Sequence, residues 1–343
     1  MTEIAATRPG ATGTALERLV TWLRLSFAIQ RWELLLVAAG TAVLAAAMLW
    51  IAWQASMLVN LNPSCFTGDG AGGACQGLQE QFSELASFSR QLILASFAAP
   101  FGIGLILGVP IVAREIDHDT ASLAWTLSKS RVRWLLPRVA FAVVLAIGVL
   151  GVVAVASDAM TQAVQPTSNI AADFTWYGRR GGLLVMRGLL ALAIGLAIGA
   201  VLGRQLPALL VAIFASVVIF TGVTIGMDRW FETDAMVAPF GDELPAGSLM
   251  LGQQLQLPDG QITTWAELDP TGQRNIAIEN DGMVYASIDE NGVASDPIGR
   301  MVTFVVPGSL YPTFVLRESG VVGAAALLIV GLAFLVVRRR RPY

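Results

Sequence analysis

The chain has 343 residues, of which 55% are hydrophobic and only 14% are charged, and its mean hydropathy is +0.64. Because about a quarter of the residues in soluble domains are charged, this composition excludes an ordinary soluble protein and indicates an integral membrane protein. The formal net charge of -3 is unevenly distributed: residues 228–315 hold thirteen acidic residues and three arginines, and the rest of the chain is net basic.

Residues 1–31 are expected to lie in the cytoplasm. They carry charges throughout and lack the compact apolar core of a signal peptide. Residues 14–17 read TALE, which matches a capping box, and apolar residues follow at helical spacing. We expect residues 14–31 to form an amphipathic helix on the inner membrane surface; the alternative is a cytosolic helix packed against another surface.

Six apolar stretches are long enough to cross a bilayer, since a hydrocarbon core of roughly 30 Å needs about 20 helical residues. The sequence therefore predicts an all-α integral membrane protein, with five spans in residues 32–227 and a last span with a basic tail in residues 317–343. The stretches run approximately from Glu33 to Leu58, Leu92 to Ala113, Leu135 to Ala156, Leu183 to Gly203, Leu206 to Met227 and Ser319 to Val337.

Most arginines fall in connections that six spans place on one side of the membrane. These connections are the N-terminal region, residues 114–134, Arg204 and the tail at 338–341. By the positive-inside rule, we expect both termini and residues 114–134 to lie in the cytoplasm. Arg179 and Arg180 lie on the other side, against the rule.

Two connections on the outer side have their own signals. Cys65 and Cys75 share a polar, glycine-rich loop, which suits a disulfide; two free thiols are the alternative. Residues 228–316 contain repeated turn signals, and residues 275–279 and 283–288 are typical of short strands around a tight turn. We expect a small extracytoplasmic insert with some β-structure, whose acidic residues form a solvated face rather than a cation site.

Glycines recur inside the spans at the spacing of closely packed helices. We expect them to serve helix packing rather than to line a pore; they are Gly104, Gly108, Gly195, Gly199 and Gly203. Arg187 is the most notable charge inside a span and is a functional candidate by default. A structural role, with the side chain reaching the interface or pairing with Glu318, is the favoured interpretation.

Catalytic chemistry has few candidates in this sequence. His118 is the only histidine, and Lys129 is the only lysine and follows Ser128, so a P-loop of the form GxxxxGK[ST] cannot be built. We expect no catalytic residues, no metal and no cofactor in this chain, and no nucleotide hydrolysis by it alone.

Residues 108–134 read GVPIVAREIDHDTASLAWTLSKSRVRW. This stretch resembles permease subunits of bacterial ABC transporters of the type-2 exporter class, except that His118-Asp119 replaces the glycine usual at the turn. The resemblance implies a coupling helix that docks on a separate cytoplasmic ABC ATPase, where ATP and Mg²⁺ would bind, and a second permease copy as partner. The expected coupling residues are Glu115, Ile116, Asp117, Thr120, Leu123, Leu127, Lys129 and Arg131.

The residues themselves fit such a docking surface. Thr120 can cap a helix on which Leu123 and Leu127 share a face, and Ile116 extends this face if the helix begins earlier. Charged residues surround it, as in an interface with an apolar centre and a polar rim.

The predicted function is therefore ATP-driven export of an amphipathic substrate such as a drug, lipid or peptide, as in multidrug efflux. An ion-coupled secondary transporter is disfavoured because the spans contain almost no acidic residues and no evident inverted repeat. A membrane module that does not transport, but senses or transmits a signal through the acidic outer insert, remains an alternative.

Overall fold

The computed structural model describes residues 31–66, 75–118, 130–241, 243–264, 267, 277–278, 282–285 and 297–340. Two predicted features lie outside these ranges. They are the amphipathic helix over residues 14–31, except for Arg31, which begins the first described helix, and the docking helix expected within residues 119–129.

Within the part of the chain that the structure describes, six helices are long and apolar enough to cross a membrane, as expected for a multi-pass, mainly helical membrane protein. The second helix begins at Gln76, well before the predicted span at Leu92, because its polar first turns continue the helix beyond the hydrocarbon region. A short helix, α4 (Pro110–Asp117), directly follows it after Val109. The six helices are α2 (Arg31–Leu61), α3 (Gln76–Gly108), α6 (Arg131–Val164), α7 (Gly182–Leu202), α8 (Gln205–Thr233) and α10 (Tyr311–Arg339).

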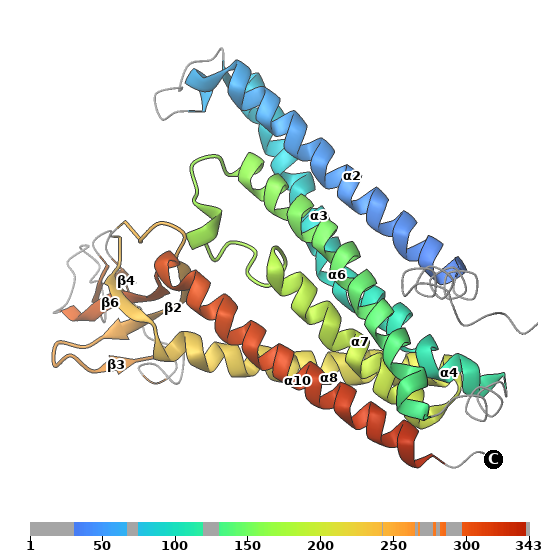
Figure 1. The fold of residues 1–343 in the computed structure, drawn as a ribbon. Coiled ribbons are helices and arrows are strands. Elements are labelled where there is room, and N and C mark those ends of the chain that lie inside the picture. Colours follow the sequence, from blue (N-terminus) through green and yellow to red (C-terminus); the bar gives the residue numbers. More distant parts are fainter. Residues whose placement is uncertain are drawn as a thin grey trace, which may run out of the picture.

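The helices run side by side with alternating direction, so the bundle has two ends (Figure 1). We call basal the end where α2 and α6 begin, α7 passes into α8, and α10 stops. Helix α7 is the most enclosed of the six: 61% of its apolar segment is buried, compared with 22% for α8 and for α10. Large apolar side chains on the outer helices are exposed instead, as expected for surfaces that face lipid; examples are Phe214, Leu327 and Leu328.

Exposed tryptophans on α2 indicate where the membrane boundaries lie. Trp32 is 70% exposed near the basal end, and Trp50 and Trp53 are 53% and 56% exposed toward the other end. Between Trp32 and Trp50 the helix rises about 27 Å at 1.5 Å per residue, close to the thickness of a hydrocarbon core. Tryptophan prefers both membrane–water interfaces, so this spacing fits α2 as a span.

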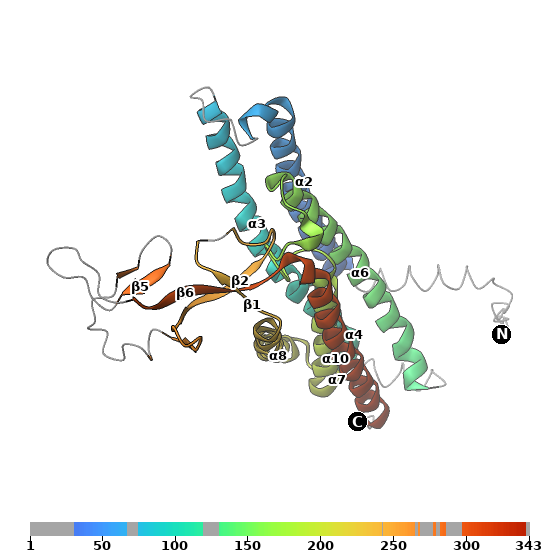
Figure 2. The same ribbon diagram turned by 90° about the vertical axis from the view of Figure 1, so that its left-hand side faces the viewer.

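The segment between α8 and α10 contains an antiparallel sheet at the non-basal end of these two helices (Figures 1 and 2). Its strands follow the order β3-β2-β6-β5-β4, with β1 also paired to β6, and Leu255, Val284 and Met301 form a small core. The pair β4–β5 lies within the two segments for which the sequence predicts strands. The strands are β1 (Met236–Pro239), β2 (Leu249–Gln256), β3 (Ile262–Thr263), β4 (Ala277–Ile278), β5 (Met283–Tyr285) and β6 (Pro297–Val306).

Candidate functional site at the basal end of the bundle

Helix α4 is held to two other helices by ion pairs. Arg138 of α6 donates from Nη1 to Oε1 of Glu115 at 2.6 Å, and Arg114 pairs with Glu33 of α2 at 2.9 Å. The carboxylate of Glu115 is largely buried, with 16% of its side chain exposed. Glu115 therefore pairs with Arg138 inside the bundle. The sequence pattern predicted instead that Glu115 belongs to the charged rim of a docking surface.

Ile116 also faces the bundle. It packs against the largest apolar cluster, and its Cγ2 lies beside Gly203, where an added Cβ would be 2.8 Å away. Helix α4 ends at Asp117 with His118 as its C-cap, so Ile116 does not extend a helix that begins at Thr120. The sequence interpretation in which one earlier-starting helix carries Ile116 on the same face as Leu123 and Leu127 is therefore wrong. Residue spacing alone cannot show where a helix ends, so it could not reject this interpretation.

Asp117 connects α4 to the start of α8. Its Oδ2 accepts a hydrogen bond from the backbone N–H of Gln205 at 3.4 Å, at the first residue of α8. A carboxylate at this place satisfies an otherwise unpaired helical N–H and interacts favourably with the helix dipole.

Arginines join the ends of α6, α10 and α7 in a chain of contacts. Arg131, at the start of α6, donates to the carbonyl oxygens of Val337, Arg338 and Arg340. Arg340 in turn donates to the carbonyl oxygens of Ala200 and Val201 in the last turn of α7. Cations at helix C-termini pair with carbonyl groups that have no partner within the helix.

The structure therefore brings three of the predicted coupling residues, Glu115, Asp117 and Arg131, into contact with α6, α8 and the end of α10. Their partners Arg138 and Gln205 were not predicted from the sequence, and neither was the Arg114–Glu33 pair that joins α4 to α2. Arg138 had a local signal, since it lies four residues after Trp134 and its guanidinium sits 4.4 Å from that ring. A fourth predicted coupling residue, Ile116, packs inside the bundle, and the remaining four, Thr120, Leu123, Leu127 and Lys129, lie outside the described residues.

At the predicted glycines, the backbone of α7 lies unusually close to the backbone of α3 and of Val109, which precedes α4. A Cβ at Gly104 would lie 2.5 Å from the carbonyl oxygen of Gly188, and a Cβ at Gly199 would lie 2.7 Å from that of Val109. Gly108 and Gly195 likewise face backbone atoms of the opposite helix. Such contacts transmit displacement directly between helices because no flexible side chain separates them.

Gly203 has a different role from the one predicted. It is the C-cap of α7 with φ of 68°, a left-handed conformation, and its N–H donates to the carbonyl oxygen of Gly199. A side chain there would be strained and would also collide with Ile116 and Arg340. The small-residue spacing predicted helix packing for Gly203, but the helix ends at this residue.

A buried ion pair lies toward the non-basal end. Arg187 of α7 and Glu318 of α10 approach to 2.6 Å, and the side chain of Glu318 has no exposed surface. Arg187 also donates to the carbonyl oxygen of Gly178 at 2.8 Å. Burial raises the pKa of the neighbouring Tyr177, and the charge of Glu318 raises it further, so this hydroxyl stays protonated. The pair thus joins α7, α10 and the segment before α7.

Arg180, an exception to the positive-inside rule, is also buried. Only 3% of its side chain is exposed. It donates to the carbonyl oxygens of Ile170, Asp173 and Thr175 and to Oδ1 of Asp158. Because these contacts satisfy its charge inside the protein, Arg180 carries little information about topology.

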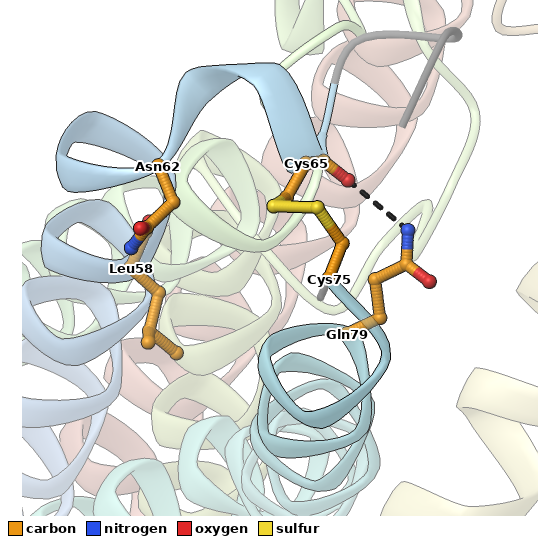
Figure 3. The surroundings of a disulfide bond; sticks show 5 residues. All are labelled: Leu58, Asn62, Cys65, Cys75 and Gln79. Carbon is orange, nitrogen blue, oxygen red and sulfur yellow. Dashed lines mark hydrogen bonds between the residues drawn. A yellow bond between two sulfur atoms is a disulfide. The ribbon is translucent and has the colours of Figure 1, made fainter. Parts of the chain in front are cut away.

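Cys65 and Cys75 form a disulfide with a Cα–Cα distance of 5.4 Å, which confirms the predicted pairing (Figure 3). The bond joins the end of α2 to the start of α3. Gln79 of α3 donates to the carbonyl oxygen of Cys65 at 3.1 Å. The two helices are thereby closed into a hairpin at the end remote from the basal contacts.

A family model described as ABC-2 membrane transporter related matches residues 38–231, which is more than half of the chain. The chain belongs to this family. The permease resemblance is confirmed, and the six helices agree with a membrane-spanning transporter subunit. The match includes the basal stretch 114–134 and ends just before the sheet and α10. Comparison with curated proteins and with solved structures gave no match.

Proposed function

We propose that this permease is the membrane-spanning half of an ATP-driven exporter in a bacterial inner membrane. A separate ABC ATPase docks at the basal end through residues 119–129, and two permeases surround the export path. The cargo is an amphipathic drug, lipid or peptide. Nucleotide with Mg²⁺ binds to the ATPase, and the permease itself hydrolyses none.

The observation that carries this proposal is that the described residues on both sides of the docking stretch in the sequence are bonded to different spans. Its N-terminal side is fixed through Glu115 to α6 and through Asp117 to α8. Its C-terminal side is fixed through Arg131 to the end of α10. A displacement of residues 119–129 by a closing ATPase would therefore act on several spans at once, and the close α3–α7 contact would carry it to the centre of the bundle.

The first experiment tests docking. Replacing Leu123 and Leu127 together by Asp removes the proposed apolar contact, and loss of a buried interface anchor commonly costs about 2 kcal/mol or more. We expect affinity for the ATPase encoded beside the permease gene to fall more than about tenfold, while insertion is unchanged. Co-purification and binding to the permease in nanodiscs measure this. The matched control is Leu61→Asp, at a side chain 71% exposed beyond Trp53, which should leave the affinity unchanged.

The second experiment separates docking from transmission. Glu115→Gln weakens the contact of α4 with α6 but leaves the docking stretch intact. We expect unchanged ATPase affinity and a several-fold drop in ATP-dependent uptake of a fluorescent amphipathic amine into inside-out liposomes, because a neutral amide bonds a guanidinium less strongly than a carboxylate does. Unchanged affinity in the Leu123/Leu127 double variant would show that this stretch is only a charged loop.

A second candidate function rests on the sheet. β1 follows α8 within a few residues, and β6 leads through Gly308–Leu310 into α10. A ligand that binds the sheet could therefore displace α8 and α10 directly. A sensor that does not transport needs such a connection between its binding site and the spans. ATPase binding without ATP-dependent uptake of any amphipathic probe, together with loss of ATPase regulation when residues 240–300 are replaced by a short linker, would favour this function.

A further inference from the structure

An open pocket of about 770 Å³ lies at the basal end between α7 and α10. Val201 and Leu332, which line it, are each 59% exposed on spanning helices, so the pocket opens toward the membrane. The residues that line it are Ala200, Val201, Leu332, Leu335, Val336, Arg339 and Arg340.

The α10 wall of this pocket is amphipathic along its length. Positions 332, 335, 336 and 339 recur at the three- and four-residue spacing of one helical face, and Arg340 follows as the C-cap of the helix. The three nearer the middle of the membrane, Leu332, Leu335 and Val336, are apolar, and the two at the helix end are Arg339 and Arg340. The pocket is thus apolar at the depth of the hydrocarbon core and cationic near the surface of the bilayer.

Both arginines have donors available for an anion. No described carboxylate pairs with either of them. Arg340 uses Nη1 to bond the carbonyl oxygens of Ala200 and Val201, which fixes its guanidinium at the pocket wall, and Arg339 is exposed beside it. Guanidinium groups bind phosphate oxygens strongly and with defined geometry.

We propose that this pocket binds an anionic phospholipid, with the headgroup phosphate between Arg339 and Arg340 and an acyl chain along the apolar wall. A free phosphate would leave that wall uncovered. A second permease would need an acidic surface there, yet the described basal carboxylates Glu33, Glu115 and Asp117 already bond within the chain. Basic pockets between spans on the cytoplasmic side commonly recognise lipid headgroups. Lipid binding here requires neither the cargo nor a docked ATPase, so it can be tested on the permease alone.

The test uses the full-length permease in detergent, titrated with phosphatidylglycerol or phosphatidylcholine and followed by thermal unfolding and native mass spectrometry. We expect phosphatidylglycerol to raise the Tm and to remain bound, and phosphatidylcholine to do neither. Arg339→Gln should weaken phosphatidylglycerol binding about tenfold, and Val201→Trp, which fills the pocket, should weaken it as much. Arg338→Gln removes the same charge from the adjacent residue outside the pocket and should have little effect.

Each other outcome contradicts the proposal. Equal losses in the Arg338 and Arg339 variants would show diffuse attraction to a basic tail. Equal stabilisation by phosphatidylcholine would show a non-specific lipid layer, and the same shift with inorganic phosphate alone would show an anion site. Val201→Cys supplies the only reduced thiol of the chain, since Cys65 and Cys75 are bonded; disulfide-linked dimers of this variant in liposomes would show that a second permease covers the pocket.

Discussion

Glu318 is fully buried, and the stability of its charge depends on Arg187. We expect Arg187→Met to destabilise the permease by about 3–5 kcal/mol, because removing one partner leaves an uncompensated buried charge. The double variant Arg187→Met/Glu318→Gln should recover most of this loss. Thermal unfolding of the four proteins in detergent forms a double-mutant cycle that measures the coupling.

The matched control at this scale is the pair Arg317–Asp234, one residue away on α10, whose side chains are 43% and 30% exposed. Exposed pairs contribute about 0–1 kcal/mol, so Arg317→Met should change stability little. If Arg187→Met and Arg317→Met lower the free energy of unfolding by the same amount, the burial of Glu318 does not explain the contribution of its ion pair to stability.

At the scale of the helices, the backbone contact between α3 and α7 allows no side chain at Gly104. A methyl group there would meet the Gly188 carbonyl oxygen at 2.5 Å and the Ala191 Cβ at 2.7 Å. We expect Gly104→Ala to cost about 1–3 kcal/mol through overpacking. Gly102→Ala is the control on the same helix, because its Cβ would meet nothing within 4 Å; it should be neutral or stabilise by up to about 1 kcal/mol. Equal unfolding temperatures for the two variants would contradict the close contact.

At the scale of the whole molecule, the charge pattern and the six helices together predict which end faces the cell exterior. The disulfide end should be outside. In intact cells, a membrane-impermeant maleimide should label Cys65 and Cys75 only after reduction with an impermeant reductant. Labelling only in inside-out vesicles would invert the topology. Replacing both cysteines by Ser should cost about 2–3 kcal/mol, since the bond closes a loop of ten residues in sequence separation.

Much of the architecture could be predicted from sequence because membrane helices are specified locally. Each span satisfies its own backbone hydrogen bonds, so a run of apolar residues such as 183–203 is sufficient to locate it. The disulfide was predictable for a similar reason, since Cys65 and Cys75 are close in the chain. The candidate site was less predictable: the charge pattern drew attention to Glu115 and Asp117, but their partners Arg138 and Gln205 come from other helices, and one-dimensional spacing contains no information about such contacts.

The sequence by itself determined the membrane class, the six spans and the family, because hydropathy, the count of apolar residues and a contiguous motif are properties of the chain order. Only the tertiary structure decided what the charges do. Arg180 just before the fourth span and Arg187 within it are only seven positions apart, yet one binds mainly backbone carbonyl oxygens and the other a carboxylate 131 positions away. Burial makes an unpaired charge costly, so packing determines each partner, and the partner determines whether an arginine marks topology, joins helices or is left to bind a ligand.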